Sequence, residues 1–234
     1  MSADKWQAVI FDLDDTLYPE QSYVMSGFRA VAEWADLHLG ISYWQGFSEL
    51  KKLFNDGVRG NTFDQWLALH GIDNKFIPNL VKVYREHFPH ITPYPDAVSL
   101  LDILHPDFLL GVISDGYLKV QQNKLKALGL EKYFDAILFT DKLGRTFWKP
   151  HAKPFEVMLE MLRISDPERA VYIGDNPTKD FLGAKRIGIK TIWLRLESGE
   201  YASLGPPTIA HAPDAQVSSF SQLKKYLLDN FNGK

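Results

Sequence analysis

The chain has 234 residues, of which 45% are hydrophobic and 13% aromatic, and it contains no cysteine. A chain of this size buries roughly 70 to 75% of its unfolded surface, which is enough for one large domain or for a domain with a smaller insert. The composition excludes disulfide bonds and thiolate metal sites, and the net charge of −3 provides no basic surface for nucleic acid. No run of about 18 apolar residues is present, so we expect a cytoplasmic protein without a membrane partner.

The first predicted element is a buried strand at Ala8–Phe11, a continuous apolar run that ends at three aspartates. Roughly ninety residues separate this run from the next one, whereas a helical crossover needs only about a dozen. The segment between them has helical spacing of apolar residues in four stretches, within 24–35, 50–54, 63–67 and 76–83. We therefore predict a helical insert at residues 19–91 and a main domain formed by residues 1–18 and 92–234. The insert leaves from the carboxyl end of a strand, the edge where open parallel sheets bind ligands, so it is placed to act as a lid.

Further apolar runs follow the insert and alternate with stretches of helical periodicity. The runs are Leu109–Ile113, Ala136–Phe139, Ala170–Ile173 and Thr191–Leu194, with helices expected within 118–128, 155–162 and 181–187. Continuous apolar strands separated by helices are typical of a parallel sheet that is covered on both faces. We therefore predict an α/β fold, with a three-layer, doubly wound (Rossmann-like) parallel sheet. Residues 199–213 are rich in glycine and proline and predict a surface loop, and residues 220–231 predict a last core helix.

Two aspartates after the first strand, Asp12 and Asp14, are expected on one side of the extended chain. Two carboxylates about 4 Å apart repel by about 4 kcal/mol at an effective dielectric near 20, so such a pair needs a cation or a proton. Oxygen ligands without cysteine or clustered histidine favour Mg²⁺ over zinc. A solvated acidic turn is the alternative. An EF-hand calcium loop is excluded, because Leu17 and Tyr23 stand where it needs glycine and glutamate.

The later predicted strands also end in polar residues that suit a phosphate group. These residues are Ser114, Asp115 and Gly116 after the second strand, Lys149 after the third, and Asp175 and Asp180 after the fourth. A hydroxyl and backbone amides next to a glycine can donate to phosphate oxygens, and a lysine can neutralise them. Each signal alone has an ordinary structural explanation, such as a helix cap, a solvated lysine or a turn. All of them, however, fall at one edge of the same predicted sheet.

Together these motifs resemble the haloacid dehalogenase superfamily of phosphatases and related enzymes, over essentially the whole chain. The first motif stands at Asp12–Thr16, the second at Ser114, the third at Lys149, and the fourth at Asp175 and Asp180. The insert is similar to the helical, C1-type cap that many members close over their substrate. Lys153, in a second Lys-Pro pair, is the alternative for the third motif, and Asp115 stands where many relatives have asparagine.

The resemblance implies a magnesium-dependent phosphatase. Asp12 would be the nucleophile that forms an aspartyl-phosphate, and Asp14 would act first as an acid and then as a base. Ser114 and Lys149 would hold the phosphoryl group, together with Asp115 and Gly116. The implied Mg²⁺ ligands are Asp12, Asp175 and the backbone carbonyl of Asp14, with Asp180 as a direct or indirect ligand.

Three other functions on the same scaffold are weighed against this one. A dehalogenase is disfavoured because such members lack the second acid, here Asp14. A phosphomutase uses the same core residues and stays the alternative, and a non-catalytic binding protein is less favoured because no catalytic position is missing. We expect a small phosphorylated metabolite as the substrate, of the sugar phosphate or nucleotide class. The polar residues of the insert that could select it are Arg59, Tyr84, Arg85 and His87, and the sequence does not indicate the oligomeric state.

Overall fold

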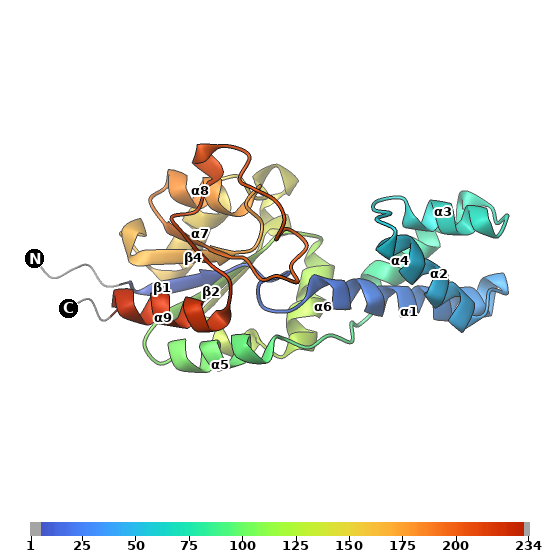
Figure 1. The fold of residues 1–234 in the computed structure, drawn as a ribbon, viewed down its shortest axis with the longest axis horizontal. Coiled ribbons are helices and arrows are strands. Elements are labelled where there is room, and N and C mark those ends of the chain that lie inside the picture. Colours follow the sequence, from blue (N-terminus) through green and yellow to red (C-terminus); the bar gives the residue numbers. More distant parts are fainter. Residues whose placement is uncertain (1–5, 232–234) are drawn as a thin grey trace, which may run out of the picture. The chain divides into compact units, whose positions relative to one another are not determined.

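The protein is described by a computed structural model in which residues 6–231 are placed (Figure 1). The chain divides into two compact units. The first unit comprises Met1–Glu20 together with Thr92–Lys234, and the second comprises Gln21–Ile91. Among the residues placed, no helix has the length and apolar character that crossing a bilayer requires.

The first unit is built on a parallel sheet, with six strands in the described part of the chain in the order β3-β2-β1-β4-β5-β6. The strands are β1 (Ala8–Phe11), β2 (Leu109–Ser114), β3 (Ala136–Phe139), β4 (Ala170–Gly174), β5 (Lys190–Leu194) and β6 (Ala215–Val217). β1 lies near the centre, where Ala8 is in register with Leu109 of β2 and with Ala170 of β4. The predicted doubly wound sheet is confirmed. The sequence did not predict β6, because Ala-Gln-Val is too short to form an apolar run.

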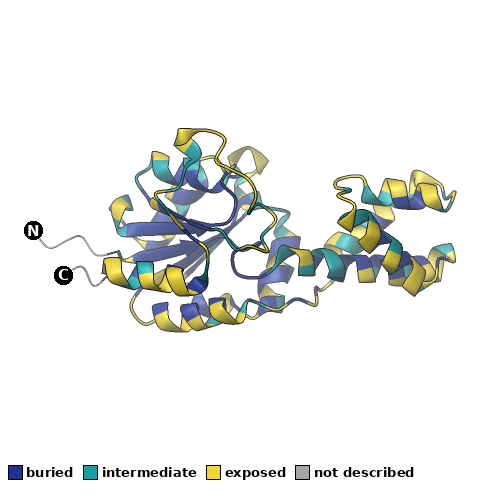
Figure 2. Ribbon diagram, in the orientation of Figure 1, coloured by how far each residue is buried: buried dark blue, intermediate teal, exposed yellow. Residues whose placement is uncertain are grey.

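Helices cover both faces of this sheet. They are α5 (Pro95–Leu104), α6 (Leu118–Leu128), α7 (Lys153–Leu162), α8 (Asp180–Arg186) and α9 (Phe220–Phe231). On one face α7 and α8 pack against the strands, and their Phe155, Met158 and Phe181 form a cluster with Ile10 of β1. On the other face α5 and α9 pack against each other. The strands are buried almost throughout (Figure 2), as continuous apolar runs require.

The helix α5 was not among the predicted elements. Its buried residues Ala97, Leu100, Leu101 and Leu104 have helical spacing, and Pro95 occupies its first turn, where proline is tolerated. The short segment lies directly before β2, and the prediction assigned it to the main domain without an element of its own.

The second unit contains the four predicted helices. They are α1 (Glu20–Leu39), which begins in the first unit, α2 (Tyr43–Asn55), α3 (Thr62–Leu69) and α4 (Ile77–Glu86). Phe28, Leu50, Trp66 and Leu80 form the centre of an apolar cluster in this unit. Trp66 is fully buried, and its indole Nε1 donates a hydrogen bond to Glu49 Oε2 at 2.8 Å. The unit therefore has a hydrophobic core of its own.

Candidate active site

The carboxyl ends of three neighbouring strands position the first residues of the site. Asp12 follows β1 directly, Ser114 is the last residue of β2, and Asp175 follows β4. Because β1 lies between β2 and β4, these three residues meet at one edge of the sheet. The backbone N–H of Asp12 donates to the Ile173 carbonyl at 2.8 Å, so the ladder between β1 and β4 continues to Asp12.

Lys149 lies buried among acidic side chains. Its Nζ donates to Asp12 Oδ1 at 2.7 Å, to Asp180 Oδ1 at 2.7 Å and to the Tyr172 hydroxyl at 2.8 Å. Burial alone would lower the pKa of Lys149, but the charges of Asp12 and Asp180 hold that pKa well above its ordinary value. The ammonium group is therefore charged, and it fixes one oxygen of Asp12.

Three carboxylates form a cluster that can hold a cation. Asp12, Asp175 and Asp180 each offer an oxygen, and these oxygens lie within 4.8 Å of one another. Within residues 6–231, Asp12 Oδ2 and Asp175 Oδ2 are buried and have no hydrogen-bond partner. Burial, followed by the charge of Asp180, raises the pKa of Asp175 well above its ordinary value, and burial raises the pKa of Asp12 to about 6 although Lys149 opposes it. Buried carboxylate oxygens without partners are costly, and hard oxygen donors suit Mg²⁺, so the cluster fits this ion.

Asp14 has different partners from Asp12. Its Oδ1 accepts hydrogen bonds from Lys124 Nζ at 2.7 Å and from the Tyr18 hydroxyl, and its Oδ2 accepts one from Gln121 Nε2 at 2.8 Å. Burial would raise the pKa of Asp14, but the charge of Lys124 and these hydrogen bonds lower it below its ordinary value. The chain bends at Leu13 after β1 and turns at residues 15–17, and Asp14 pairs with Tyr18 in an isolated bridge. The cation beside Asp14 is Lys124, and the Asp14 carboxylate is not part of the three-carboxylate cluster found in the described residues.

Ser114 and Gly116 both lie against Gln121. The Ser114 side chain is fully buried, and its Oγ accepts a hydrogen bond from Gln121 Nε2. Gly116 has a φ of +125°, and a Cβ at this position would lie 3.2 Å from the Gln121 side chain. Glycine is needed here both for the backbone conformation and for the space that Gln121 occupies.

The Asp115 carboxylate binds the loop that carries Lys149. Its Oδ1 accepts hydrogen bonds from Thr140 Oγ1 at 2.7 Å and from the backbone N–H of Lys149 at 3.3 Å. Lys153, the alternative for the third motif, lies at the surface, where its Nζ is 3.3 Å from Glu156 Oε2. The structure thus brings Lys149 to the carboxylates and leaves Lys153 at the surface.

Gln121 and Lys124 of α6 belong to the site but were not predicted from the sequence. Both lie on the buried face of the helix, together with Val120, Leu125 and Leu128. The available signal was the position of these two polar side chains within an otherwise apolar helical stripe.

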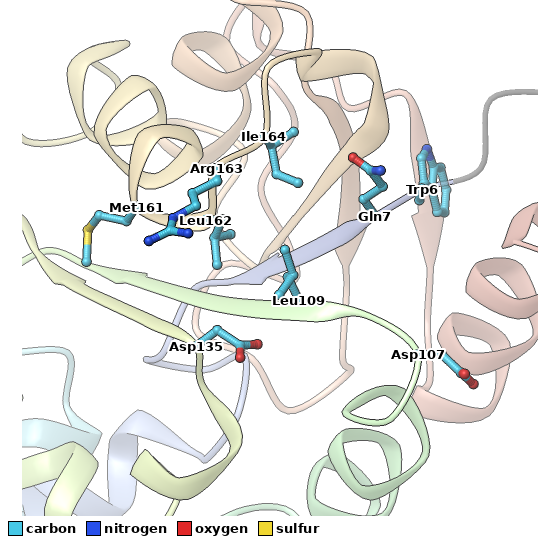
Figure 3. A pocket seen from close by; sticks show the side chains of 9 residues that line it. All are labelled: Trp6, Gln7, Asp107, Leu109, Asp135, Met161, Leu162, Arg163 and Ile164. Carbon is cyan, nitrogen blue, oxygen red and sulfur yellow. The ribbon is translucent and has the colours of Figure 1, made fainter.

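A separate groove of about 650 Å³ lies away from the site (Figure 3). Gln7, Leu109, Asp135 and Ile164 are among the residues that line it. Gln7 precedes β1 and Leu109 begins β2, so the groove lies at the amino ends of the strands, opposite to the carboxylates. The Asp135 carboxylate already accepts the backbone N–H of Leu110 at 2.8 Å.

Comparison with known proteins identifies the family. The profile of the haloacid dehalogenase-like hydrolases matches residues 9–194. The chain is a haloacid dehalogenase-like hydrolase. This hydrolase is 31% identical, over 221 residues, to a glyceraldehyde 3-phosphate phosphatase of Methanopyrus kandleri, a match that covers 90% of this chain and 92% of the relative. It is 27% identical to the pyrimidine 5'-nucleotidase YjjG of Escherichia coli, with coverage of 95% and 98%.

A solved structure supports the fold of this hydrolase. The haloacid dehalogenase family hydrolase from Deinococcus radiodurans R1, determined with bound phosphate and sodium, matches with a TM-score of 0.69 and 19% identity. The match covers 97% of each chain. The family resemblance and the fold predicted from the sequence are therefore confirmed.

Proposed function

We propose that this hydrolase is a magnesium-dependent phosphatase of small phosphomonoesters and that Asp12 is its nucleophile. The observation that carries the proposal is the state of the Asp12 carboxylate. Lys149 binds its Oδ1, whereas its Oδ2 is buried and has no hydrogen-bond partner among residues 6–231. A carboxylate that is held by one oxygen and free at the other is oriented for attack on phosphorus. The phosphatases among the sequence relatives support the same activity.

In this proposal Asp12, Asp175 and Asp180 hold Mg²⁺, and the backbone carbonyl of Asp14 is a further ligand. When bound, the ion offsets the negative charge of the phosphoryl oxygens. The support is the clustering of the three carboxylates and the two buried oxygens that lack a partner in the described part of the chain. Lys149 already neutralises part of the charge of this cluster, because it bridges Asp12 and Asp180.

The side chains of the site divide the reaction into two steps. Asp12 attacks phosphorus and forms an aspartyl-phosphate, while the bond to the leaving oxygen breaks and Asp14, which enters this step in its protonated form, gives its proton to that oxygen. Asp14 then takes a proton from water, which attacks the intermediate and releases inorganic phosphate and free Asp12. Ser114 and Lys149 hold the phosphoryl oxygens, so positioning and electrostatics supply most of the acceleration.

We further propose that the unit Gln21–Ile91 is the cap that selects a sugar phosphate or a nucleotide. The sequence relatives named for glyceraldehyde 3-phosphate and for pyrimidine nucleotides support this substrate class. The unit contains a cavity of about 300 Å³ whose lining includes Arg59, Tyr84 and Arg85. His87 has a structural contact instead, because its Nδ1 lies 2.7 Å from the Tyr84 carbonyl oxygen. We also propose that the enzyme acts in the cytoplasm, where such phosphorylated metabolites occur.

Hydrolysis of p-nitrophenyl phosphate with and without MgCl₂ tests the activity, and a panel of sugar phosphates and nucleotides ranked by kcat/KM tests the substrate class. We expect phosphate release that EDTA abolishes and that Mg²⁺ restores, and a phosphorylated protein that disappears in Asp12→Asn. The proposal is wrong if no phosphate ester is hydrolysed, or if turnover persists unchanged after chelation. Transfer of the phosphoryl group to another hydroxyl of the substrate, without phosphate release, would identify a phosphomutase.

A further inference from the structure

Two polar residues interrupt the buried face of α6. Gln121 is 1% exposed and Lys124 is 3% exposed, whereas Leu125 and Leu128 beside them are ordinary apolar core residues. A buried ammonium group is costly unless it is paired, and Lys124 Nζ lies 2.7 Å from Asp14 Oδ1. Hydrophobic packing would be served better by apolar side chains, so the two polar groups need another explanation.

The Gln121 amide joins three groups of the site. Its Nε2 has three acceptors within reach, Asp14 Oδ2 at 2.8 Å, the Asp115 carbonyl oxygen at 2.7 Å and Ser114 Oγ, and it shares its two hydrogens among them. The carboxylate of Asp14, in its charged form, and the Asp115 carbonyl can only accept hydrogen bonds, which determines the orientation of the amide. One side chain therefore sets the separation between the acid/base residue and the phosphate-binding hydroxyl.

This contact also determines what the Ser114 hydroxyl can do. A serine hydroxyl has one hydrogen to donate and two lone pairs with which to accept. Because Gln121 Nε2 is a donor and cannot accept, the Ser114 hydroxyl does not give its hydrogen to Gln121, and that hydrogen is available for a phosphoryl oxygen.

Lys124 completes the arrangement from the other side of the carboxylate. Gln121 binds Asp14 Oδ2 and Lys124 binds Asp14 Oδ1, so both oxygens of Asp14 are held by one helix. The two residues are three positions apart, which places their side chains on the same face of α6. Lys124 Nζ also lies 3.7 Å from Glu20 Oε1, at the start of α1.

We infer that Gln121 and Lys124 are positioning residues of the phosphatase reaction: they hold the Asp14 carboxylate at a fixed place beside Ser114. The inference rests on the proposed function and deepens it. In this inference Gln121 and Lys124 contact Asp14 and do not contact the substrate. Their loss is therefore expected to impair the steps that use Asp14 and to leave substrate binding largely intact.

The experiment compares Gln121→Met and Lys124→Met with the wild-type enzyme. Met has a similar length and removes only the polar group. We expect kcat to fall by about 100-fold, the size of effect that misplacement of a reacting group by 1 Å produces, with KM changed by less than about threefold. Breakdown of the aspartyl-phosphate requires Asp14, so labelled phosphoenzyme should accumulate in both variants. Lys124→Arg retains the charge and should recover part of the lost kcat.

Gln122→Met and Lys126→Met are the matched controls, because these residues are exposed on the opposite face of the same helix. They should retain kcat and KM within about twofold. Circular dichroism and thermal unfolding identify any variant that does not fold. In that case the isosteric Gln121→Glu, which removes the donors, decides the question, and it should show the same loss of kcat.

The outcomes separate this inference from the proposed function. If the wild-type enzyme releases phosphate but the folded variants retain its kcat, the inference is overturned and the phosphatase stands. A rise in KM with an unchanged kcat also overturns it, because the two residues would then act in substrate binding. If the wild-type enzyme hydrolyses no phosphate ester, the proposed function itself fails.

Discussion

Replacing Asp175 by Asn is expected to stabilise the metal-free protein while it removes the stabilisation that Mg²⁺ provides. Asp175 faces Asp12 and Asp180, with oxygens within 4.8 Å, and its Oδ2 has no hydrogen-bond partner in the part of the chain that the structure describes. Lys149 bridges Asp12 and Asp180, so these three side chains together carry one net negative charge. Asp175 therefore meets a repulsion from this group, which the charge of Lys179 offsets only in part and which asparagine does not meet.

The size of this repulsion follows from the distance. Two unit charges 4.8 Å apart repel by about 3.5 kcal/mol at an effective dielectric near 20. The pKa of Asp175 is raised, so the wild-type protein relieves part of this repulsion by taking up a proton. We therefore expect Asp175→Asn to raise the free energy of unfolding of the metal-free protein by about 2 kcal/mol, which is less than the full repulsion. For a chain of this size such a gain corresponds to a rise in Tm of roughly 4 to 8 °C.

Differential scanning calorimetry in EDTA at pH 8, and again with MgCl₂, measures both effects. At a Mg²⁺ concentration of 100 times its Kd, the free energy of unfolding of the wild-type protein should rise by about 2.7 kcal/mol, whereas that of Asp175→Asn should rise little. Asp107→Asn, which changes an exposed aspartate, serves as the control and should leave both Tm values unchanged. A variant that is less stable than the wild type in EDTA and still responds fully to Mg²⁺ would refute the reasoning.

Other predictions concern the nucleophile, the third motif and the second unit. Asp12→Asn should reduce kcat to the background level, measured by phosphate release, with an unchanged circular dichroism spectrum. Lys149→Met should destabilise the protein by about 3 to 5 kcal/mol in urea unfolding, because it leaves two buried carboxylates without their cation. Lys153→Met should change neither kcat nor stability, and a large effect at this position would mean that the third motif is misassigned. Trp66→Ala should lower stability by about 3 to 5 kcal/mol in the same assay, since a fully buried indole is lost.

The parts of the site that follow strand ends could be predicted from the sequence. Asp12, Ser114 and Asp175 stand at the ends of continuous apolar runs, and parallel topology alone brings such ends to one edge. The helices of the insert could also be predicted, because the spacing of apolar residues within one helix is visible in a short stretch of sequence. Lys149 was preferred from the family resemblance, and the structure places it against Asp12.

The contacts between distant segments could not be predicted in this way. Gln121 and Lys124 lie 107 and 110 positions from Asp14, so only the folded topology shows that they meet it. The placement of Asp12 and Asp14 on one side of the chain stays a prediction, because the strand ends at Phe11 and the alternation of an extended chain is not maintained through the residues that follow. The spacing of residues along a helix or strand therefore predicts positions within that element, but not contacts with residues outside it.

The hydrogen bond from the Asp12 amide to Ile173 has a consequence for heat inactivation. It extends the ladder of a strand that has a neighbour on each side, in the region of a domain that exchanges its amide protons last. Local unfolding of chain ends or loops does not break this hydrogen bond of Asp12. The amide of Asp12 should therefore exchange with solvent deuterium only when the whole first unit opens, and loss of the nucleophile on heating should coincide with cooperative melting of the sheet.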